Sequence, residues 1–136
     1  MNQNSAFRID LDKILRGKAP KHYRKIPRFL ISYLKRIVHQ EDINGILERN
    51  SGLEGVPFMH ALVEKEFHLT LKLKGEENIP SEGRFVFASN HPLGGLDGIC
   101  LSSVVGDKFN GKIKYLVNDI LYYIDPLKPI FVPINK

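Results

Sequence analysis

FVFASNHPLGGLDG, residues 85–98, is the segment of the sequence that says most about its fold. An apolar run ends in Asn-His, two glycines follow, and an aspartate precedes a second apolar run. This order predicts a strand, a tight turn and the start of a helix. A strand that ends in Asn90 and His91 brings both side chains to the carboxyl edge of a sheet, where open α/β folds bind their ligands. The stretch therefore predicts an α/β fold with a site at the strand ends.

Four strands are predicted around this motif, at residues 67–74, 84–90, 112–118 and 129–134. The first alternates apolar and polar residues, which is typical of a half-buried strand. The second lacks alternation, which indicates burial on both faces. We expect Asp97 to cap the helix that follows and Gly106 to end it, with a short helix near residues 119–123.

Before residue 67 the apolar spacing is helical, with helices expected at residues 9–17, 27–38, 41–50 and 56–67. The predicted architecture is thus α/β, with N-terminal amphipathic helices followed by a mixed sheet. We divide the chain into residues 1–66, a basic helical region, and residues 67–136, the first part of an α/β domain.

Composition narrows the class of protein. The 136 residues are 43% hydrophobic, enough to bury a core, and the single cysteine, Cys100, cannot form an internal disulfide. Cysteine and histidine do not cluster at the spacing of metal ligands, and no apolar run is long enough to span a membrane. These features favour a cytoplasmic protein without a bound metal.

Positive charge is concentrated near the N-terminus. The chain carries 20 Lys and Arg against 15 Asp and Glu, and residues 16–36 contain no acidic residue. Anionic lipid and nucleic acid are both admissible partners for such a block, and a solvated basic helix is the plain alternative. The candidate membrane- or anion-binding residues are Arg24, Lys25, Arg28, Lys35 and Arg36.

His91 and Asp97 are the candidate catalytic pair. A neutral imidazole can take a proton from an attacking hydroxyl, and a carboxylate on its other nitrogen fixes the tautomer. Gly94 and Gly95 allow a tight turn and leave room for a substrate near the backbone. With no Ser or Cys nucleophile beside His91, the pattern suits direct attack by a substrate hydroxyl. A loop histidine and a helix-capping Asp97 explain the same residues without catalysis.

The run LTLKLKGEENIPSEGRFVFASNHPLGGLDG, residues 69–98, resembles the first signature block of the glycerolipid (lysophosphatidic acid type) acyltransferase superfamily. The resemblance extends to about residue 133. It implies that His91 is the general base on the acceptor hydroxyl, that Asp97 is its partner, and that Asn90, Gly94 and Gly95 contact substrate. The implied donor is an acyl thioester, acyl-CoA or acyl-ACP, with no bound cofactor. The implied acceptor is the hydroxyl of a lysolipid or a glycerol-phosphate-type molecule.

Two departures from the superfamily pattern matter. Five residues separate His91 from Asp97 where the family has four, and the glycine pair offers a bulge that absorbs the extra residue. The NHPLGGLDG form is similar to a bacterial branch that acylates lyso amino lipids. The family's later acceptor-binding block is absent, so we expect a truncated chain that lacks activity, exposes its terminal strand and self-associates through it.

Together these observations predict an O-acyltransferase of lipid biosynthesis that works peripherally on the cytoplasmic face of the membrane. The alternative is a noncatalytic basic module that docks on a membrane or on nucleic acid. Tyr33, Tyr115, Tyr122 and Tyr123 are interpreted as core or interface aromatics and not as a base-stacking surface, so no specific nucleic-acid partner is expected.

Overall fold

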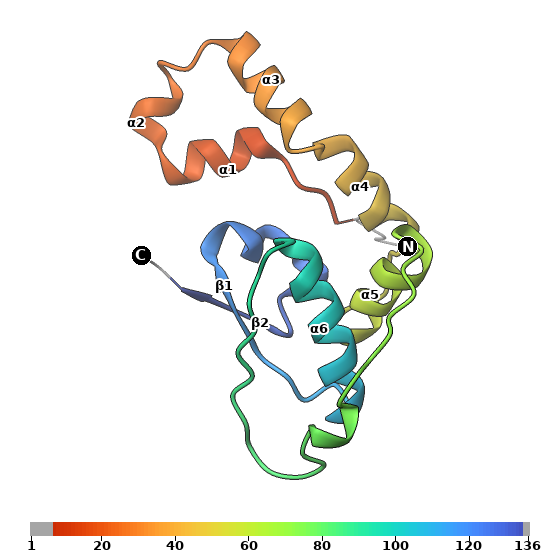
Figure 1. The fold of residues 1–136 in the computed structure, drawn as a ribbon. Helices are drawn as coiled ribbons and strands as arrows, with labels where there is room; N and C mark the ends of the chain where they lie inside the picture. Colours follow the sequence, from red (N-terminus) through yellow and green to blue (C-terminus); the bar gives the residue numbers. More distant parts are fainter. Residues whose placement is uncertain (1–6, 135–136) are drawn as a thin grey trace, which may run out of the picture. The chain divides into compact units, whose positions relative to one another are not determined.

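The computed structural model describes residues 7–134, which form two compact units (Figure 1). Unit 1 runs to Gly52 and includes Tyr123–Asp125, and unit 2 contains Leu53–Tyr122 and the segment from Pro126 onward. The division into residues 1–66 and 67–136 was made by expected role, and it stays a prediction. The helices of unit 1 are α1 (Leu11–Lys18), α2 (Pro20–Tyr23), α3 (Arg28–Ile37) and α4 (Gln40–Arg49). The predicted helices at 9–17, 27–38 and 41–50 are confirmed, and α2 was not foreseen.

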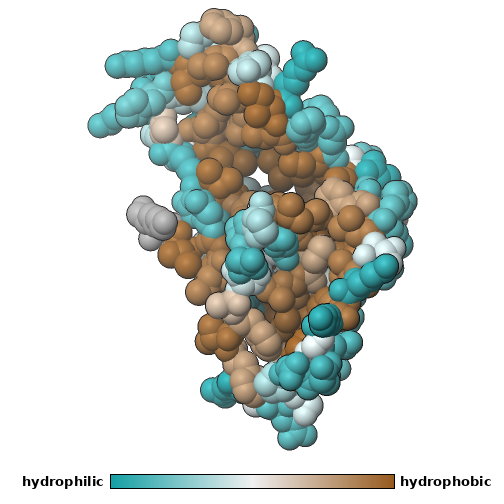
Figure 2. All heavy atoms as spheres, in the orientation of Figure 1, coloured by the Kyte–Doolittle hydropathy of each residue, from teal (hydrophilic) through white to brown (hydrophobic). Residues whose placement is uncertain are grey.

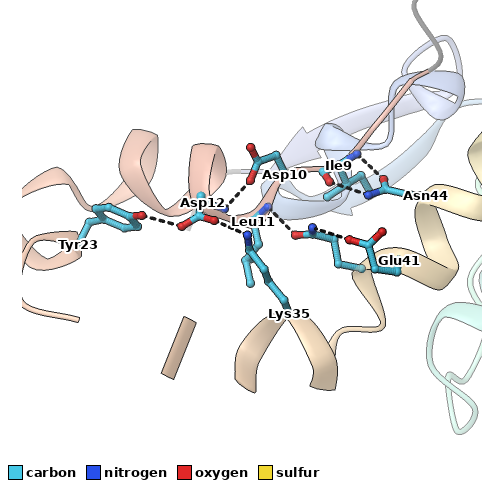
Figure 3. Close-up of polar contacts among 9 residues, drawn as sticks. Ile9, Asp10, Leu11, Asp12, Tyr23, Lys35, Glu41 and Asn44 are labelled. Atoms are coloured by element: carbon cyan, nitrogen blue, oxygen red, sulfur yellow. Dashed lines mark hydrogen bonds and ion pairs between the residues drawn. The ribbon is translucent and has the colours of Figure 1, made fainter. Parts of the chain in front are cut away.

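Side-chain amides join the start of α1 to α4. The Ile9 N–H donates to Asn44 Oδ1 at 2.7 Å, and Asn44 Nδ2 donates back to the Ile9 carbonyl at 3.0 Å (Figure 3). The Leu11 N–H donates to Gln40 Oε1 at 2.9 Å. Asn44 and Gln40 are buried, and buried amides are stable only when they are hydrogen-bonded. These bonds therefore fix the position of α1 against α4.

Asp12 links α1 to α2 and α3. Its carboxylate accepts a hydrogen bond of 2.6 Å from the Tyr23 hydroxyl and forms an ion pair with Lys35 (Figure 3). The Lys35 ammonium, and then the Tyr23 hydroxyl, lower the pKa of the Asp12 carboxyl below its usual range. Asp12 is therefore ionised at neutral pH and holds three helices together.

The outer face of α3 is apolar and uncovered. Phe29 is 76% exposed and Tyr33 59% exposed, and Ile37 continues the same stripe. Figure 2 shows apolar side chains on the surface of the unit 1 helices among hydrophilic ones. Ile31, on the opposite face, is buried. Helix α3 is thus amphipathic, with a second apolar stripe that unit 1 does not use for packing.

Unit 2 is built on two packed helices, α5 (Gly55–Ala61) and α6 (Gly95–Lys108). A π-helical turn, Leu62–Glu66, continues α5 and completes the helical segment predicted at residues 56–67. The buried apolar side chains of this packing include Val56, Phe58, Met59, Leu62, Val63 and Val105. Helix α6 does not end at Gly106, as predicted, but continues to Lys108. Gly106 instead permits the close approach, because a β-carbon there would lie 2.6 Å from both methyl carbons of Val56.

The strands β1 (Tyr115–Asn118) and β2 (Phe131–Ile134) form a parallel pair in which Tyr115 lies opposite Phe131. The connection between them contains 3₁₀ turns at Asp119–Tyr123 and Asp125–Leu127. Ile130 and Phe131 are buried, as is Val117. The strands predicted at 112–118 and 129–134 and the short helix near 119–123 are therefore confirmed.

The strands predicted at residues 67–74 and 84–90 are wrong. Neither segment carries a strand in the described structure, and β1 and β2 pair only with each other there. The leucines of the first segment instead line a cavity beside α5 and α6. The second segment is exposed rather than buried on both faces, with Val86 97% exposed. Alternation predicts which side chains share a face, but a strand also needs a backbone partner, which depends on distant residues.

The α/β class holds in its coarser form, as helices with a small parallel sheet. A mixed sheet is not present among residues 7–134, where the sheet has two parallel strands. The placement of an active site at the strand ends stays a prediction. Within residues 7–134, no helix has the length and apolar character needed to cross a membrane.

Candidate functional site

His91 and Asp97 lie together at the start of α6. His91 precedes the helix in a turn, and Asp97 is in its first turn. The distance from His91 Nδ1 to Asp97 Oδ2 is 3.6 Å, within ion-pair range and slightly longer than a hydrogen bond. The His91 side chain is 64% exposed and that of Asp97 22% exposed. Because Nδ1 faces the carboxylate, Nε2 is the nitrogen available to an incoming molecule.

The same carboxylate oxygen also holds the turn. The Leu93 N–H donates to Asp97 Oδ2 at 2.7 Å, while Gly94 adopts a φ of +64°, a backbone conformation that favours glycine. Asp97 is therefore not the helix N-cap that was predicted, because α6 begins earlier and Gly94 is the capping residue. An acidic residue in the first turn that accepts an N–H from the preceding loop stabilises a helix start in the same way as a capping box.

The five-residue spacing from His91 to Asp97 has a local explanation. The left-handed turn at Gly94 and the hydrogen bond from Leu93 fold the extra residue into the loop, so the two side chains still meet. A β-carbon at Gly94 or Gly95 would have no neighbour within 4 Å, so space is open beside both glycines. The main-chain carbonyl oxygen of Asn90 accepts a 2.7 Å hydrogen bond from the Ser89 hydroxyl. Substrate contact by these three residues stays a prediction.

Two residues near Asp97 remain protonated. Burial, and then the negative charge of Asp97, raises the pKa of the Cys100 thiol and of the Tyr115 hydroxyl. Cys100 is therefore a poor nucleophile. Tyr115 lies against Gly98, where a β-carbon would be 3.5 Å from the phenol oxygen. The sequence offered no direct signal for Tyr115, because it follows Asp97 by many residues and lies on another element.

The five candidate anion-binding residues of unit 1 differ in availability. Lys35 is engaged by Asp12. Arg24, Lys25, Arg28 and Arg36 are exposed, and none forms an ion pair with another residue of the described chain. Four of the five candidates are therefore exposed cations. Membrane or anion binding by them stays a prediction.

A second polar cluster joins α5 to α6. His60 Nε2 lies 2.8 Å from Asp107 Oδ1, and His60 Nδ1 lies 2.9 Å from the Ser103 hydroxyl. All three residues line a cavity of about 460 Å³, together with Leu69, Leu71 and Leu73. Ser103 sits in the interior of α6, where the backbone N–H groups are bonded within the helix.

His60 lies between two packed helices, and its side chain is 30% exposed. The two partners were missed. The available signal was that Ser103 and Asp107 lie four residues apart on the predicted helix, which places them on one face.

No group of three or more His, Cys, Asp or Glu side chains within residues 7–134 is arranged to hold a metal ion. His91 and Asp97 give this region of unit 2 an exposed imidazole beside a carboxylate at the start of a helix.

The chain matches the family described as acyltransferase over residues 13–136, a range that includes the basic helices as well as the His91 motif. It is 52% identical over all 136 residues to a lyso-glycine lipid O-acyltransferase of Bacteroides thetaiotaomicron and covers 50% of that protein. It is 46% identical to a lyso-glycine lipid O-acyltransferase of Phocaeicola vulgatus, covering 48% of it. The chain thus spans about half the length of these curated relatives. No solved structure matches it. The match over residues 13–136 places this chain in the acyltransferase family.

Proposed function

We propose that the protein is an O-acyltransferase of lipid biosynthesis that transfers a fatty acyl group from a thioester to the hydroxyl of a lysolipid. The observation that carries the proposal is the 3.6 Å approach of His91 Nδ1 to Asp97 Oδ2, in a histidine whose side chain is 64% exposed. Family membership and the names of the two relatives support the reaction class.

The proposed mechanism needs no covalent enzyme intermediate. His91 Nε2 takes the proton of the acceptor hydroxyl as its oxygen attacks the thioester carbonyl carbon. The tetrahedral intermediate collapses, the carbon–sulfur bond breaks, and the thiolate leaves with the proton that His91 returns. Asp97 stabilises the imidazolium that exists between the two proton transfers. The products are an ester and a free thiol.

The donor in this proposal is acyl-CoA or acyl-ACP, which is a substrate and not a resident cofactor. The acceptor is a lysolipid or a glycerol-phosphate-type molecule, and a lyso-glycine lipid is the favoured choice because both relatives carry that name. The space beside Gly94 and Gly95 allows an acceptor to approach His91.

We place the protein peripherally on the cytoplasmic face of a membrane. Support comes from α3, where the exposed apolar side chains of Phe29 and Tyr33 adjoin the cations Arg28 and Arg36 on one helix. A helix of this kind lies in the interface of an anionic membrane. A noncatalytic basic docking module accounts for the same helix without chemistry at His91, and it is the alternative.

Substitution of His91 distinguishes an acyltransferase from a noncatalytic docking module. The variant His91→Asn should lower acyl transfer from acyl-CoA or acyl-ACP to a lyso-glycine lipid by about 10²–10⁴-fold, because the general base is lost. His68→Asn is the matched control: His68 is exposed and has a φ of +50°, which asparagine tolerates. Both variants should keep the circular dichroism spectrum of the parent. The comparison is made in a protein whose parent form is active, and equal activity of the two variants there would favour the docking module.

We further propose that the chain self-associates through its sheet. Within residues 7–134, β1 and β2 pair only with each other, so each strand has one unpaired edge. Leu116 of β1 and Val132 of β2 are exposed. An open edge pairs readily with another strand. Sedimentation of the 136-residue chain should give a concentration-dependent mass, and Val132→Lys should reduce it, since a charged residue on an edge opposes pairing.

A further inference from the structure

Unit 1 has a cavity of about 660 Å³, open to solvent, that is lined by residues of α1, the α2 region and α3. Cationic side chains dominate its lining, which contains Lys13, Arg16, Arg24, Arg28 and Lys35 against two carboxylates. The volume is in the range of small-molecule sites. The His91 motif belongs to unit 2, so this cavity is a separate feature of the chain.

Both carboxylates of the cavity are already occupied. Asp12 lies between Tyr23 and Lys35 and interacts with both (Figure 3). Asp10 caps α1, where its side chain accepts a 2.9 Å hydrogen bond from the Asp12 N–H. Arg16 is stacked over the Tyr23 ring at 4.9 Å. Both carboxylates and two of the five cations, Arg16 and Lys35, are thus engaged in contacts within the chain.

Lys13, Arg24 and Arg28 remain. All three are exposed, and none forms an ion pair with any other of residues 7–134. Arg28 is the first residue of α3, whose first turn contains no acidic residue to offset its charge. The Ser32 hydroxyl, one turn further along α3, lines the same cavity and adds a neutral donor. Two guanidinium groups and an ammonium around one hollow suit an anion with several oxygens.

We propose that this cavity binds the anionic headgroup of a membrane lipid. Two of the α3 residues that line the cavity, Arg28 and Ser32, are each followed in sequence by an exposed aromatic residue, Phe29 and Tyr33. Successive residues of a helix are about 100° apart, so the cationic and aromatic stripes are adjacent. A headgroup in the cavity therefore has an apolar surface beside it for the lipid chains. A free phosphate ion would make no use of that surface.

The inference rests on the membrane association proposed above, and it does not depend on acyl transfer at His91. It goes further because it assigns affinity to a defined cavity and not to the general charge of the basic block. Lys25 and Arg36 belong to the same block and are exposed but do not line the cavity, so they provide a matched comparison.

The test measures binding of the full chain to phosphatidylcholine vesicles with and without phosphatidylglycerol. The variant Arg24→Gln/Arg28→Gln is compared with Lys25→Gln/Arg36→Gln, and each removes two exposed positive charges. We expect the cavity pair to lose about ten-fold more affinity for the anionic vesicles than the control pair, the value of one charge-assisted hydrogen bond. Equal losses would overturn the proposal, because diffuse attraction to the surface would explain the binding.

A second arm distinguishes the lipid from a free anion. Inorganic phosphate is titrated against the parent and the cavity variant at constant ionic strength. The lipid headgroup is ruled out as occupant if phosphate binding requires Arg24 and Arg28 while vesicle binding does not. Failure of the parent chain to bind anionic vesicles at all would remove both this site and the proposed membrane association. If the parent chain binds anionic vesicles but the cavity pair loses no more affinity than the control pair, only this site is removed.

Discussion

His60 Nε2 lies 2.8 Å from Asp107 Oδ1, so one imidazole on α5 is tied to the last turns of α6. An ionised carboxylate only accepts hydrogen bonds, so Nε2 carries the proton and Nδ1 accepts the bond from Ser103. Ser103 is buried, with 3% exposure, and His60 is its hydrogen-bond partner. Helix α6 also carries Asp97 in its first turn. The contact therefore fixes the helix that holds the candidate site.

The variant His60→Ala should destabilise unit 2 by about 1–3 kcal/mol, because the buried Ser103 hydroxyl loses its partner. Chemical denaturation followed by circular dichroism measures the change in unfolding free energy. His22→Ala is the control, since His22 is exposed on α2. A loss for His60→Ala no larger than that of the control would show that the cluster contributes nothing to the packing of α5 on α6.

Sequence periodicity was sufficient for elements whose partners are near in sequence. Helices α3 and α4 follow their apolar spacing, and β1 and β2 follow two short apolar runs joined by a compact connection. The proximity of His91 and Asp97 depends on a loop of five residues and is likewise local.

Features that depend on distant residues were not predictable in this way. Residues 67–74 alternate as a strand does, yet Leu69, Leu71 and Leu73 line a cavity with α5 and α6. Residues outside the segment determine whether it pairs in a sheet or packs against helices. The partners of His60 lie 43 and 47 residues away. The start of α6 was placed too late because the bond from the Leu93 N–H to Asp97 involves a backbone group, which no residue pattern displays.

Gly106 is expected to be intolerant of even one added methyl group. A β-carbon there would lie 2.6 Å from Cγ1 and Cγ2 of Val56, a buried and rotationally stiff side chain. Gly106→Ala should therefore cost about 1–3 kcal/mol of stability. Adding Val56→Ala should recover part of that loss, because it removes the two clashing methyl carbons. A double variant less stable than the sum of the single changes would contradict the close contact.

Unit 1 should lose stability in acid through Asp12. Its folded-state pKa is lowered by Lys35 and then Tyr23, so ionised Asp12 stabilises the folded chain. That contribution is fully present above the unfolded pKa of about 3.9 and is lost as pH falls through the lower folded value. The difference in melting temperature between the parent and Asp12→Asn should be largest at neutral pH and shrink below about pH 4. A difference independent of pH would mean that the ion pair with Lys35 contributes no stability.

Asp97 is expected to act in catalysis through charge as well as through the position of the loop. In Asp97→Asn the amide oxygen can still accept the hydrogen bond from the Leu93 N–H, so the turn before α6 should persist. The neutral amide cannot stabilise an imidazolium at His91, so kcat should fall at least about ten-fold while KM for the acceptor changes little. Asp42→Asn, an exposed carboxylate beside His39, is the control. Steady-state kinetics and melting temperatures decide the role: a lower melting temperature with unchanged kcat would make Asp97 a structural residue of the helix start and leave His91 without its proposed partner.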